Sequence, residues 1–214
     1  MSVTFGLSLS PELPPRLLIR LARLAESLGF SRLWFPDHLL NLNGCPAADP
    51  WTIMGAVAVK TRRIEIGTAV SDPHRNHPAL LAQKAATLDR LSQGRFVLGL
   101  GTGEAMNLEP FGIPWNRPLA RLRESIAVLR HLLESSQPLT FDGEFYRLKN
   151  ARMDLQAHNN RRIPLYLAAL GPQALLYAGQ MADGWLPVPI PVEDFAAYSA
   201  PMLQSAAEAG REPS

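Results

Sequence analysis

The stretch Arg95-Phe-Val-Leu-Gly-Leu-Gly-Thr-Gly-Glu-Ala-Met-Asn107 decides the fold class of this chain. Its first half is an apolar run that predicts a buried strand, and its second half is a glycine-rich turn with one carboxylate, Glu104. Gly101 and Gly103 lack a Cβ, so a ligand can come close to the backbone there. In α/β folds, ligands bind at the carboxyl ends of the strands, where this turn lies. The stretch therefore predicts an α/β protein with a ligand site at this turn.

The composition is ordinary for a soluble globular protein. The chain has 214 residues, of which 47% are hydrophobic and 19% charged, with a formal net charge of +2. So small a net charge gives no case for binding nucleic acid or a membrane surface. The single cysteine, Cys45, excludes an intramolecular disulfide and a cysteine-built metal site. Residues 1–9 lack the pattern of a signal peptide, and no apolar stretch could span a bilayer, so we expect a cytoplasmic protein.

Short apolar runs alternate with amphipathic segments along the chain. Strands are expected at residues 3–9, 32–35, 64–70, 96–100, 164–168 and 184–187, and helices at 14–28, 49–61, 78–91, 119–133, 172–181 and 192–209. Asp49-Pro50 supplies an N-cap and a first-turn proline for the second of these helices. Phe141-Asp-Gly-Glu-Phe-Tyr146 predicts a hairpin, because Asp-Gly favours a tight turn between strands.

Strict alternation of strands and helices implies parallel strands joined by right-handed crossovers. An open doubly wound sheet and a (β/α) barrel both satisfy this rule. A closed barrel needs eight strand–helix units, and the pattern supplies six. We therefore expect residues 1–214 to form a single, incomplete barrel domain that lacks its C-terminal units. Uncovered edge strands would then favour a homodimer.

Two loops that follow strands contain candidate histidines. Trp34-Phe-Pro-Asp-His38 places an imidazole beside a carboxylate at a strand's carboxyl end, which suits proton transfer near neutral pH. A histidine that only caps the loop would give the same pattern. His74 and His77 follow the third strand, but no carboxylate stands at the helical spacing of a zinc motif. We expect them to be exposed loop residues and assign no metal site.

The turn Gly101-Thr-Gly-Glu104 is similar to the start of a dinucleotide-binding fingerprint. The third glycine of that fingerprint would fall at position 106, which is Met106, so we exclude an NAD site. A carboxylate at a helix start also stabilises the helix dipole, so Glu104 is either structural or functional on this evidence. Gly171-Pro172 opens a helix whose free N–H groups could bind a phosphate, although an ordinary strand-to-helix turn has the same sequence.

Together these segments resemble the luciferase-like flavin and deazaflavin oxidoreductases, and most closely their coenzyme F420-dependent branch. The most specific match is Gly101-Thr-Gly-Glu-Ala-Met-Asn107. Further matches are Asp37-His38, Gly67-Thr-Ala-Val70, Arg121–Arg130 with Phe141–Leu148, and Ala182-Asp-Gly-Trp185.

The resemblance implies an incomplete TIM-like barrel with a deazaflavin across the carboxyl ends of the strands. His38 and Glu104 would be the catalytic residues, which move a proton near C5 of the ring. Ala69 and Val70 would form a bulge behind the ring, often with a non-proline cis peptide. The other cofactor-binding residues would be Asp37, Thr102, Gly103, Asn107, Ala168, Ala169, Gly171 and Pro172.

The function that the resemblance implies is hydride transfer between the C5 atom of coenzyme F420 and a small organic substrate. An FMN-dependent monooxygenase and a non-catalytic cofactor-binding partner subunit are the alternatives. The sugar-phosphate dehydrogenases of this branch carry a lysine soon after the sixth strand. Here Leu186–Val192 contains no basic residue, so we do not expect a sugar phosphate as substrate.

Overall fold

A curled sheet of six parallel strands forms the framework of the protein. The computed structural model describes residues 3–40 and 47–211, so Cys45 lies outside the described residues. The strand order is β1 (Gly6–Ser8), β2 (Arg32–Phe35), β3 (Glu65–Thr68), β4 (Phe96–Leu100), β7 (Leu165–Leu167) and β8 (Gly184–Trp185). In the described part of the chain, β1 and β8 do not pair with each other, so the sheet is a half-barrel. This confirms the incomplete TIM-like barrel of six strand–helix units.

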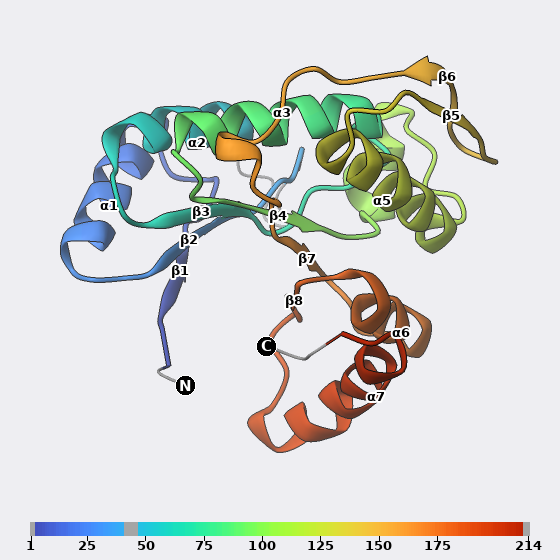
Figure 1. The fold of residues 1–214 in the computed structure, drawn as a ribbon. Coiled ribbons are helices and arrows are strands. Elements are labelled where there is room, and N and C mark those ends of the chain that lie inside the picture. Colours follow the sequence, from blue (N-terminus) through green and yellow to red (C-terminus); the bar gives the residue numbers. More distant parts are fainter. Residues whose placement is uncertain (1–2, 41–46, 212–214) are drawn as a thin grey trace.

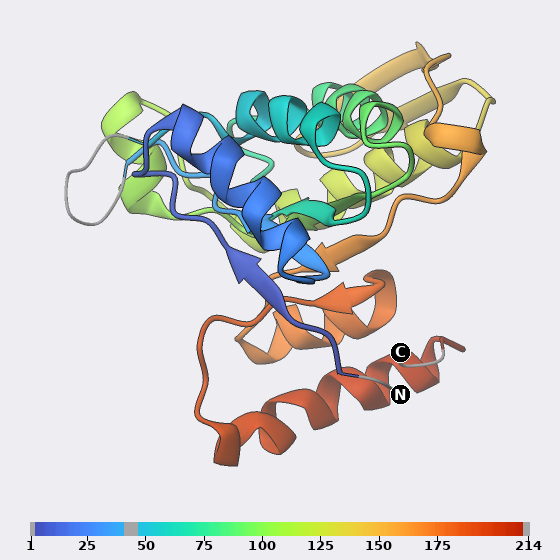
Figure 2. The ribbon, with the colours of Figure 1, turned by 90° about the vertical axis from the view of Figure 1, so that its left-hand side faces the viewer.

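Helices follow the outer face of the curled sheet. Figure 1 shows α2 and α3 above β2 to β4, with α1 on the left and α5 on the right, and α6 and α7 below β7 and β8. Figure 2 shows the molecule from the side. The bounds are α1 Pro15–Ser27, α2 Pro50–Lys60, α3 Pro78–Leu91, α5 Pro118–Glu134, α6 Pro172–Met181 and α7 Phe195–Glu208, and η3 (Val192–Asp194) precedes α7. Among the described residues, none of the helices combines the length and the hydropathy needed to cross a membrane.

Most sequence-based boundaries agree with the structure, and the largest difference is at the first strand, expected at 3–9 and observed at Gly6–Ser8. The strands at 32–35 and 96–100 and the helices at 78–91 and 172–181 match the predicted bounds. Asp49 caps α2 as predicted, because its side chain accepts a hydrogen bond from the N–H of Thr52 at 2.8 Å. The strand predicted at 64–70 is shorter at both ends, at Glu65 and Thr68, and the peptide bond between Ala69 and Val70 that follows it is cis.

The loop between β4 and β7 contains the remaining elements. The short α4 (Ala105–Leu108) and η1 (Glu109–Phe111) follow β4, and η2 (His158–Asn160) precedes β7. Strands β5 (Leu139–Asp142) and β6 (Arg147–Ala151) form the predicted antiparallel hairpin. The Glu124 carboxylate of α5 accepts hydrogen bonds from three successive N–H groups of the hairpin turn, residues 144–146. The hairpin is therefore fixed to α5.

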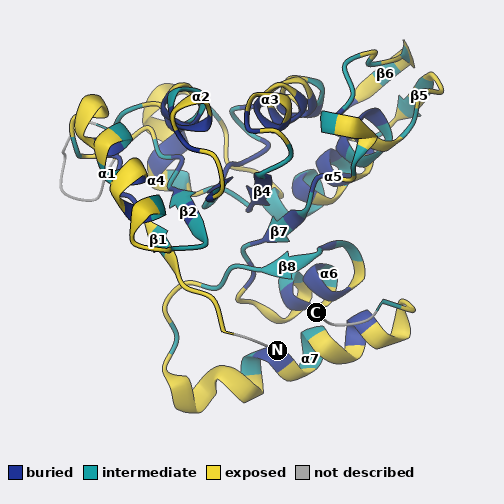
Figure 3. Ribbon diagram, turned by 60° about the vertical axis from the view of Figure 1, so that its left-hand side comes forward, coloured by how far each residue is buried: buried dark blue, intermediate teal, exposed yellow. Residues whose placement is uncertain are grey.

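The core lies between the sheet and the helices, where Figure 3 shows most of the buried residues. In β2, Leu33 and Phe35 are buried in this layer, whereas the alternate residues Arg32 and Trp34 are less buried. The Arg32 guanidinium lies over the rings of Trp34 and Tyr166, at 5.3 and 5.1 Å from the ring centroids. A Cβ on Gly67 would lie 2.5 Å from the Trp34 ring. Glycine at this position therefore makes room for a stack of aromatic rings on the inner side of the curl.

Candidate functional site

A cleft of about 690 Å³ lies at the carboxyl ends of the strands. It is lined by eleven of the twelve residues that the sequence singles out: Asp37, His38, Ala69, Val70, Thr102, Gly103, Glu104, Asn107, Ala168, Ala169 and Gly171. The twelfth, Pro172, is the first residue of α6 and follows Gly171 directly, but it does not line the cleft. The topology thus brings residues from β2, β3, β4 and β7 to one cavity, which both proposed catalytic side chains share.

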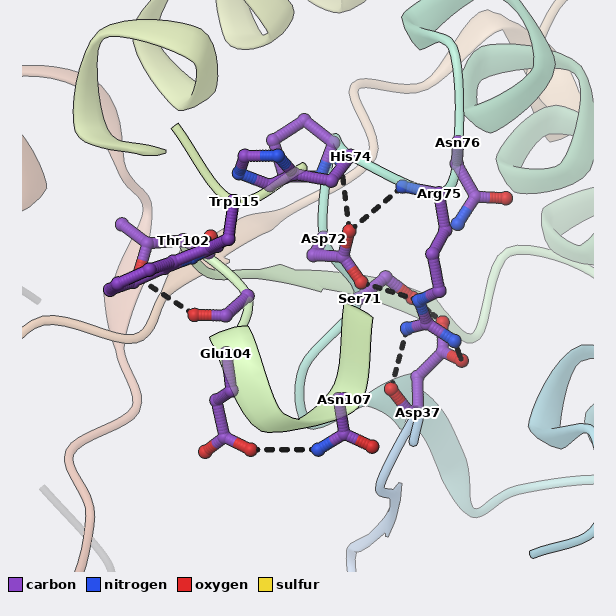
Figure 4. Close-up of polar contacts among 12 residues, drawn as sticks. Asp37, Ser71, Asp72, His74, Arg75, Asn76, Thr102, Glu104, Asn107 and Trp115 are labelled. Carbon is purple, nitrogen blue, oxygen red and sulfur yellow. Dashed lines mark hydrogen bonds and ion pairs between the residues drawn. The ribbon is translucent and has the colours of Figure 1, made fainter. Parts of the chain in front are cut away.

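The glycine-rich turn after β4 brings Glu104 to the cleft. Gly103 has φ +70°, in the left-handed region that favours glycine. Glu104 is exposed and stands at the N-cap of α4, where its carboxylate makes no capping hydrogen bond to the helix. Its Oε2 atom instead accepts a hydrogen bond from Nδ2 of Asn107 at 2.8 Å (Figure 4).

Asn107 connects the two sides of the site. It is buried, and while Nδ2 donates to Glu104, Oδ1 accepts a hydrogen bond from the N–H of Leu40 at 3.0 Å. Leu40 is two residues beyond His38, which is half-buried in the cleft wall. One amide therefore holds the Glu104 carboxylate and the segment that carries His38.

Asp37 lines the cleft, but its carboxylate is hydrogen-bonded and paired within the protein. Oδ2 accepts hydrogen bonds from Nε1 of Trp51 at 3.1 Å and from the hydroxyl of Ser71. Oδ1 pairs with Nη1 of Arg75 at 3.0 Å. Burying a carboxylate is costly unless it is paired and hydrogen-bonded, and these three donors meet that need. The side chain thus ties the end of β2 to α2 and to the loop after β3.

The end of β3 forms the back of the cleft. The peptide bond between Ala69 and Val70 is cis, as the resemblance implied. The Ala69 N–H donates to Phe35 O on β2 at 2.9 Å, so the bulge stays attached to the neighbouring strand. A Cβ on Gly101 would lie 2.6 Å from Val70 Cγ2, so only glycine fits where this bulge meets the turn after β4. The two central strand ends are thereby packed into one wall.

The loop after β3 differs from expectation at one histidine. His74 is partly buried rather than exposed, and its Nδ1 lies 3.1 Å from Pro114 O. Burial lowers the pKa of this imidazole, although the hydrogen bond to Pro114 acts in the opposite direction. His77 is exposed and caps α3 by accepting from the N–H of Ala79. Across residues 3–40 and 47–211, no group of three or more His, Cys, Asp and Glu residues could hold a metal ion.

Several residues of the site were missed by the sequence analysis. Trp34, Ser8 and Asp72 line the cleft, as do the largely apolar residues Leu186–Pro189 after β8. Trp115 donates its indole N–H to Thr102 O at 3.0 Å, which fixes the turn from outside. Asp72 and Arg75 have the i, i+3 spacing of an ion pair, and this was the one local signal available for them.

Comparison with known proteins gives consistent matches over the whole chain. A family model described as luciferase-like monooxygenase matches residues 2–214. The chain is 33% identical over 211 residues to 5,10-methylenetetrahydromethanopterin reductase of Methanolobus tindarius, covering 99% of this chain and 62% of that protein. It is 39% identical over 194 residues to F420-dependent glucose-6-phosphate dehydrogenase of Nakamurella multipartita, covering 86% and 56%.

A solved structure shows the same fold. The match is an F420-dependent secondary alcohol dehydrogenase in complex with an F420–acetone adduct, with a TM-score of 0.91 and 30% identity. It covers 100% of this chain and 66% of that one. The chain spans between about half and two thirds of the length of the curated relatives it matches.

Proposed function

The chain belongs to the luciferase-like monooxygenase family, and we propose that it is an F420-dependent oxidoreductase that transfers a hydride between deazaflavin C5 and a small organic substrate. The observation that carries this proposal is the single cleft shared by His38, Glu104 and the Ala69–Val70 bulge. The similarity of the chain to F420-dependent relatives over most of its length supports the choice of cofactor.

The cleft suits a flat ring with an anionic tail. Its volume of about 690 Å³ is within the range of about 300–1,000 Å³ found for ligand pockets. Small residues at the ends of β3 and β4 (Ala69, Gly101 and Gly103) leave the backbone accessible to a planar group. Gly171 lies at the N-terminus of the ten-residue helix α6, whose free N–H groups would bind a phosphate of the tail. When bound, the deazaflavin supplies the hydride-carrying carbon.

The proposed task of His38 and Glu104 is to manage the proton that accompanies the hydride. Reduction of a carbonyl requires a proton at the substrate oxygen, and the reverse reaction requires its removal. An imidazole and a carboxylate on the same cleft can each hold that proton. Asn107 restricts the Glu104 carboxylate by its hydrogen bond, which reduces the freedom of this group before substrate binds.

The charges of the cleft favour a substrate without a phosphate group. In the part of the chain that the structure describes, no lysine or arginine lines the cleft. Arg75 lies close by, but Asp37 and Asp72 neutralise its charge. Trp34 and residues 186–189 provide an apolar wall instead. We infer a neutral substrate such as a ketone, an alcohol or an alkene.

A comparison of two cofactors tests the proposed function. The full chain is titrated with F420 and with FMN, with fluorescence as the readout of binding. Turnover is then followed with oxidised F420 and propan-2-ol, or with reduced F420 and acetone. Tight binding of F420 with hydride transfer supports the proposal. Tight binding of FMN alone would favour a monooxygenase, and F420 binding without transfer to any neutral acceptor would favour a non-catalytic partner subunit.

We further propose a homodimer in the cytoplasm. The two ends of the sheet, β1 and β8, each lack a second neighbouring strand among the described residues, and unpaired edges promote association. Phe5, an exposed apolar residue directly before β1, adds to this tendency. A monomer in light scattering would contradict the dimer.

A further inference from the structure

We propose that Arg75 is a positioning residue that fixes the backbone on which His38 is carried. Its Nη2 donates to the main-chain oxygen of Asp37 at 2.6 Å, and its Nη1 pairs with Oδ1 of the same residue at 3.0 Å. That main-chain oxygen belongs to the peptide group that joins Asp37 to His38. The guanidinium therefore sets the orientation of the peptide plane from which His38 begins. The inference rests on the proposed function for its catalytic consequence.

Arg75 is itself held firmly on its other side. Its Nε donates to Oδ2 of Asp72 at 2.6 Å, and Oδ1 of Asp72 accepts from the main-chain N–H groups of His74 and Arg75. Figure 4 shows the guanidinium between the two aspartates. The exposed fractions of the three side chains are only 11% for Arg75, 4% for Asp37 and 6% for Asp72. Burial alone would lower the pKa of Arg75, but the two carboxylates raise it, so the group stays charged.

The segment that carries His38 is held at a second point as well. Beyond His38, the N–H of Leu40 donates to Asn107, which also binds Glu104. Arg75 and Asn107 thus hold this segment on both sides of His38. Asn107 also links the segment to Glu104, the second proposed catalytic residue. Loss of the Arg75 clamp would free the peptide plane between Asp37 and His38, because the remaining hydrogen bonds from Trp51 and Ser71 hold only the Asp37 carboxylate. A misplacement of about 1 Å can cost on the order of 100-fold in rate.

Arg161, whose side chain is 31% exposed, supplies a control at the opposite ends of the strands. Arg161 precedes β7, and its Nε donates to Oδ1 of Asp89 at 3.0 Å while Nη2 donates to the main-chain oxygen of Phe96 at 2.7 Å. It has the same two kinds of partner as Arg75, a buried aspartate and a main-chain oxygen. Arg161 does not line the cleft. If both arginines act on stability alone, replacing either one should change unfolding but leave His38 and hydride transfer unaffected.

The test compares Arg75→Lys with Arg161→Lys in the full chain. Lysine keeps the charge but cannot reproduce the planar fork of donors. We expect both variants to lose thermal stability. Only Arg75→Lys should slow hydride transfer from propan-2-ol to F420, by about tenfold or more, with cofactor affinity within about twofold of the wild type. Asp72→Asn, which loosens Arg75 from its far side, should act in the same direction if Arg75→Lys fails to fold.

A readout without cofactor separates this inference from the proposed function. The imidazole resonances of His38, assigned with a His38→Gln variant, should move in the NMR spectrum of Arg75→Lys (or of Asp72→Asn) and stay in place in Arg161→Lys. Unchanged His38 resonances, or equal changes with both arginine variants, would overturn the positioning role. A wild-type chain that binds no F420 would overturn the proposed function, while the NMR result would still decide the role of Arg75.

Discussion

The two ends of the strands differ in what their charged side chains face. At the amino ends, charged groups are enclosed by backbone: Arg95 donates to the main-chain oxygens of Ala58, Thr61 and Ile64, and Glu26 accepts from the N–H groups of residues 62–64. The carboxyl ends also hold enclosed charges, in the Arg75 cluster, but there the exposed Glu104 and the half-buried His38 face a cleft. Enclosed charges thus stabilise the fold at both ends, and the carboxyl ends in addition keep titratable groups accessible. Such a division is general in barrels of this class.

The largest expected effect concerns function at the carboxyl ends. His38→Ala should lower hydride transfer by about 10²- to 10⁴-fold, because a general acid or base contributes about that much. Cofactor affinity and the free energy of unfolding should change little, because the side chain is only half-buried. Single-turnover kinetics, F420 titration and urea unfolding check these three quantities. Normal turnover would end the assignment of His38 as a catalytic residue.

The next effect concerns stability at the amino ends. Arg161→Met leaves Asp89, which is fully buried, without its charged partner. We expect the free energy of unfolding to fall by about 3–5 kcal/mol, as is usual when one member of a buried ion pair is removed. Urea unfolding measures this loss. A fall of less than about 1 kcal/mol in the free energy of unfolding would show that this ion pair contributes little to the stability of the amino ends.

A smaller effect, also at the amino ends, depends on pH. Burial alone would raise the pKa of Asp183, but hydrogen bonds from the Leu165 N–H, Arg130 and Arg162 outweigh it and lower the pKa to about 2. A lowered pKa in the folded state stabilises the protein above the unfolded pKa of about 4. This contribution is therefore lost as the pH falls from about 4 to about 2.

The size of that loss is checked with Asp183→Asn. After allowance for partial exposure to solvent, we expect the wild type to lose about 1 kcal/mol more than the variant over this interval. Urea unfolding at pH 5 and at pH 2.5 gives the difference. Parallel losses in the two proteins would contradict the role of Asp183 in acid stability.

The smallest expected effect concerns the turn at Thr102, which lines the cleft. Trp115→Phe removes the hydrogen bond to Thr102 O from a side chain that is 37% exposed. We expect a loss of about 0.5–1.5 kcal/mol or less in unfolding free energy, together with weaker F420 binding. Chemical denaturation and fluorescence titration measure both. A large loss of stability with unchanged F420 binding would reverse the contrast between the two ends of the strands.

Local sequence signals predicted the framework well. The apolar run at β4 and the proline-started helices α3 and α6 have their periodicity and end signals within a few residues, so their bounds follow from the chain alone. The strand predicted to reach position 70 was too long, because the apolar pattern continues through Ala69 and Val70, and only the family resemblance indicated a bulge there. The half-barrel was predicted by counting strand–helix units, because parallel strands joined in sequence order allow few topologies.

Contacts between strand ends were harder to predict. Asp37 and Arg75 are 38 residues apart, and only the pairing of β2 with β3 brings them together. The family resemblance implied that Asp37 is a cofactor contact, whereas the hydrogen bonds from Trp51, Ser71 and Arg75 give it internal partners. Its contact with a cofactor stays a prediction. Spacing can place a residue at a strand end, but it does not say which neighbour takes up its hydrogen bonds.

The glycine at position 67 has a consequence for the evolution and redesign of this pocket. The Trp34 ring packs against Gly67 on one side and forms part of the cleft on the other. A Cβ at position 67 would meet the indole and also the main-chain oxygen of Val97, at 2.8 Å, so the sheet leaves no room for a larger residue there. The depth of the Trp34 ring in the cleft is thus fixed by a residue that does not line the cleft. Screens for altered selectivity can therefore vary Trp34 while keeping Gly67 and the proton-carrying groups intact.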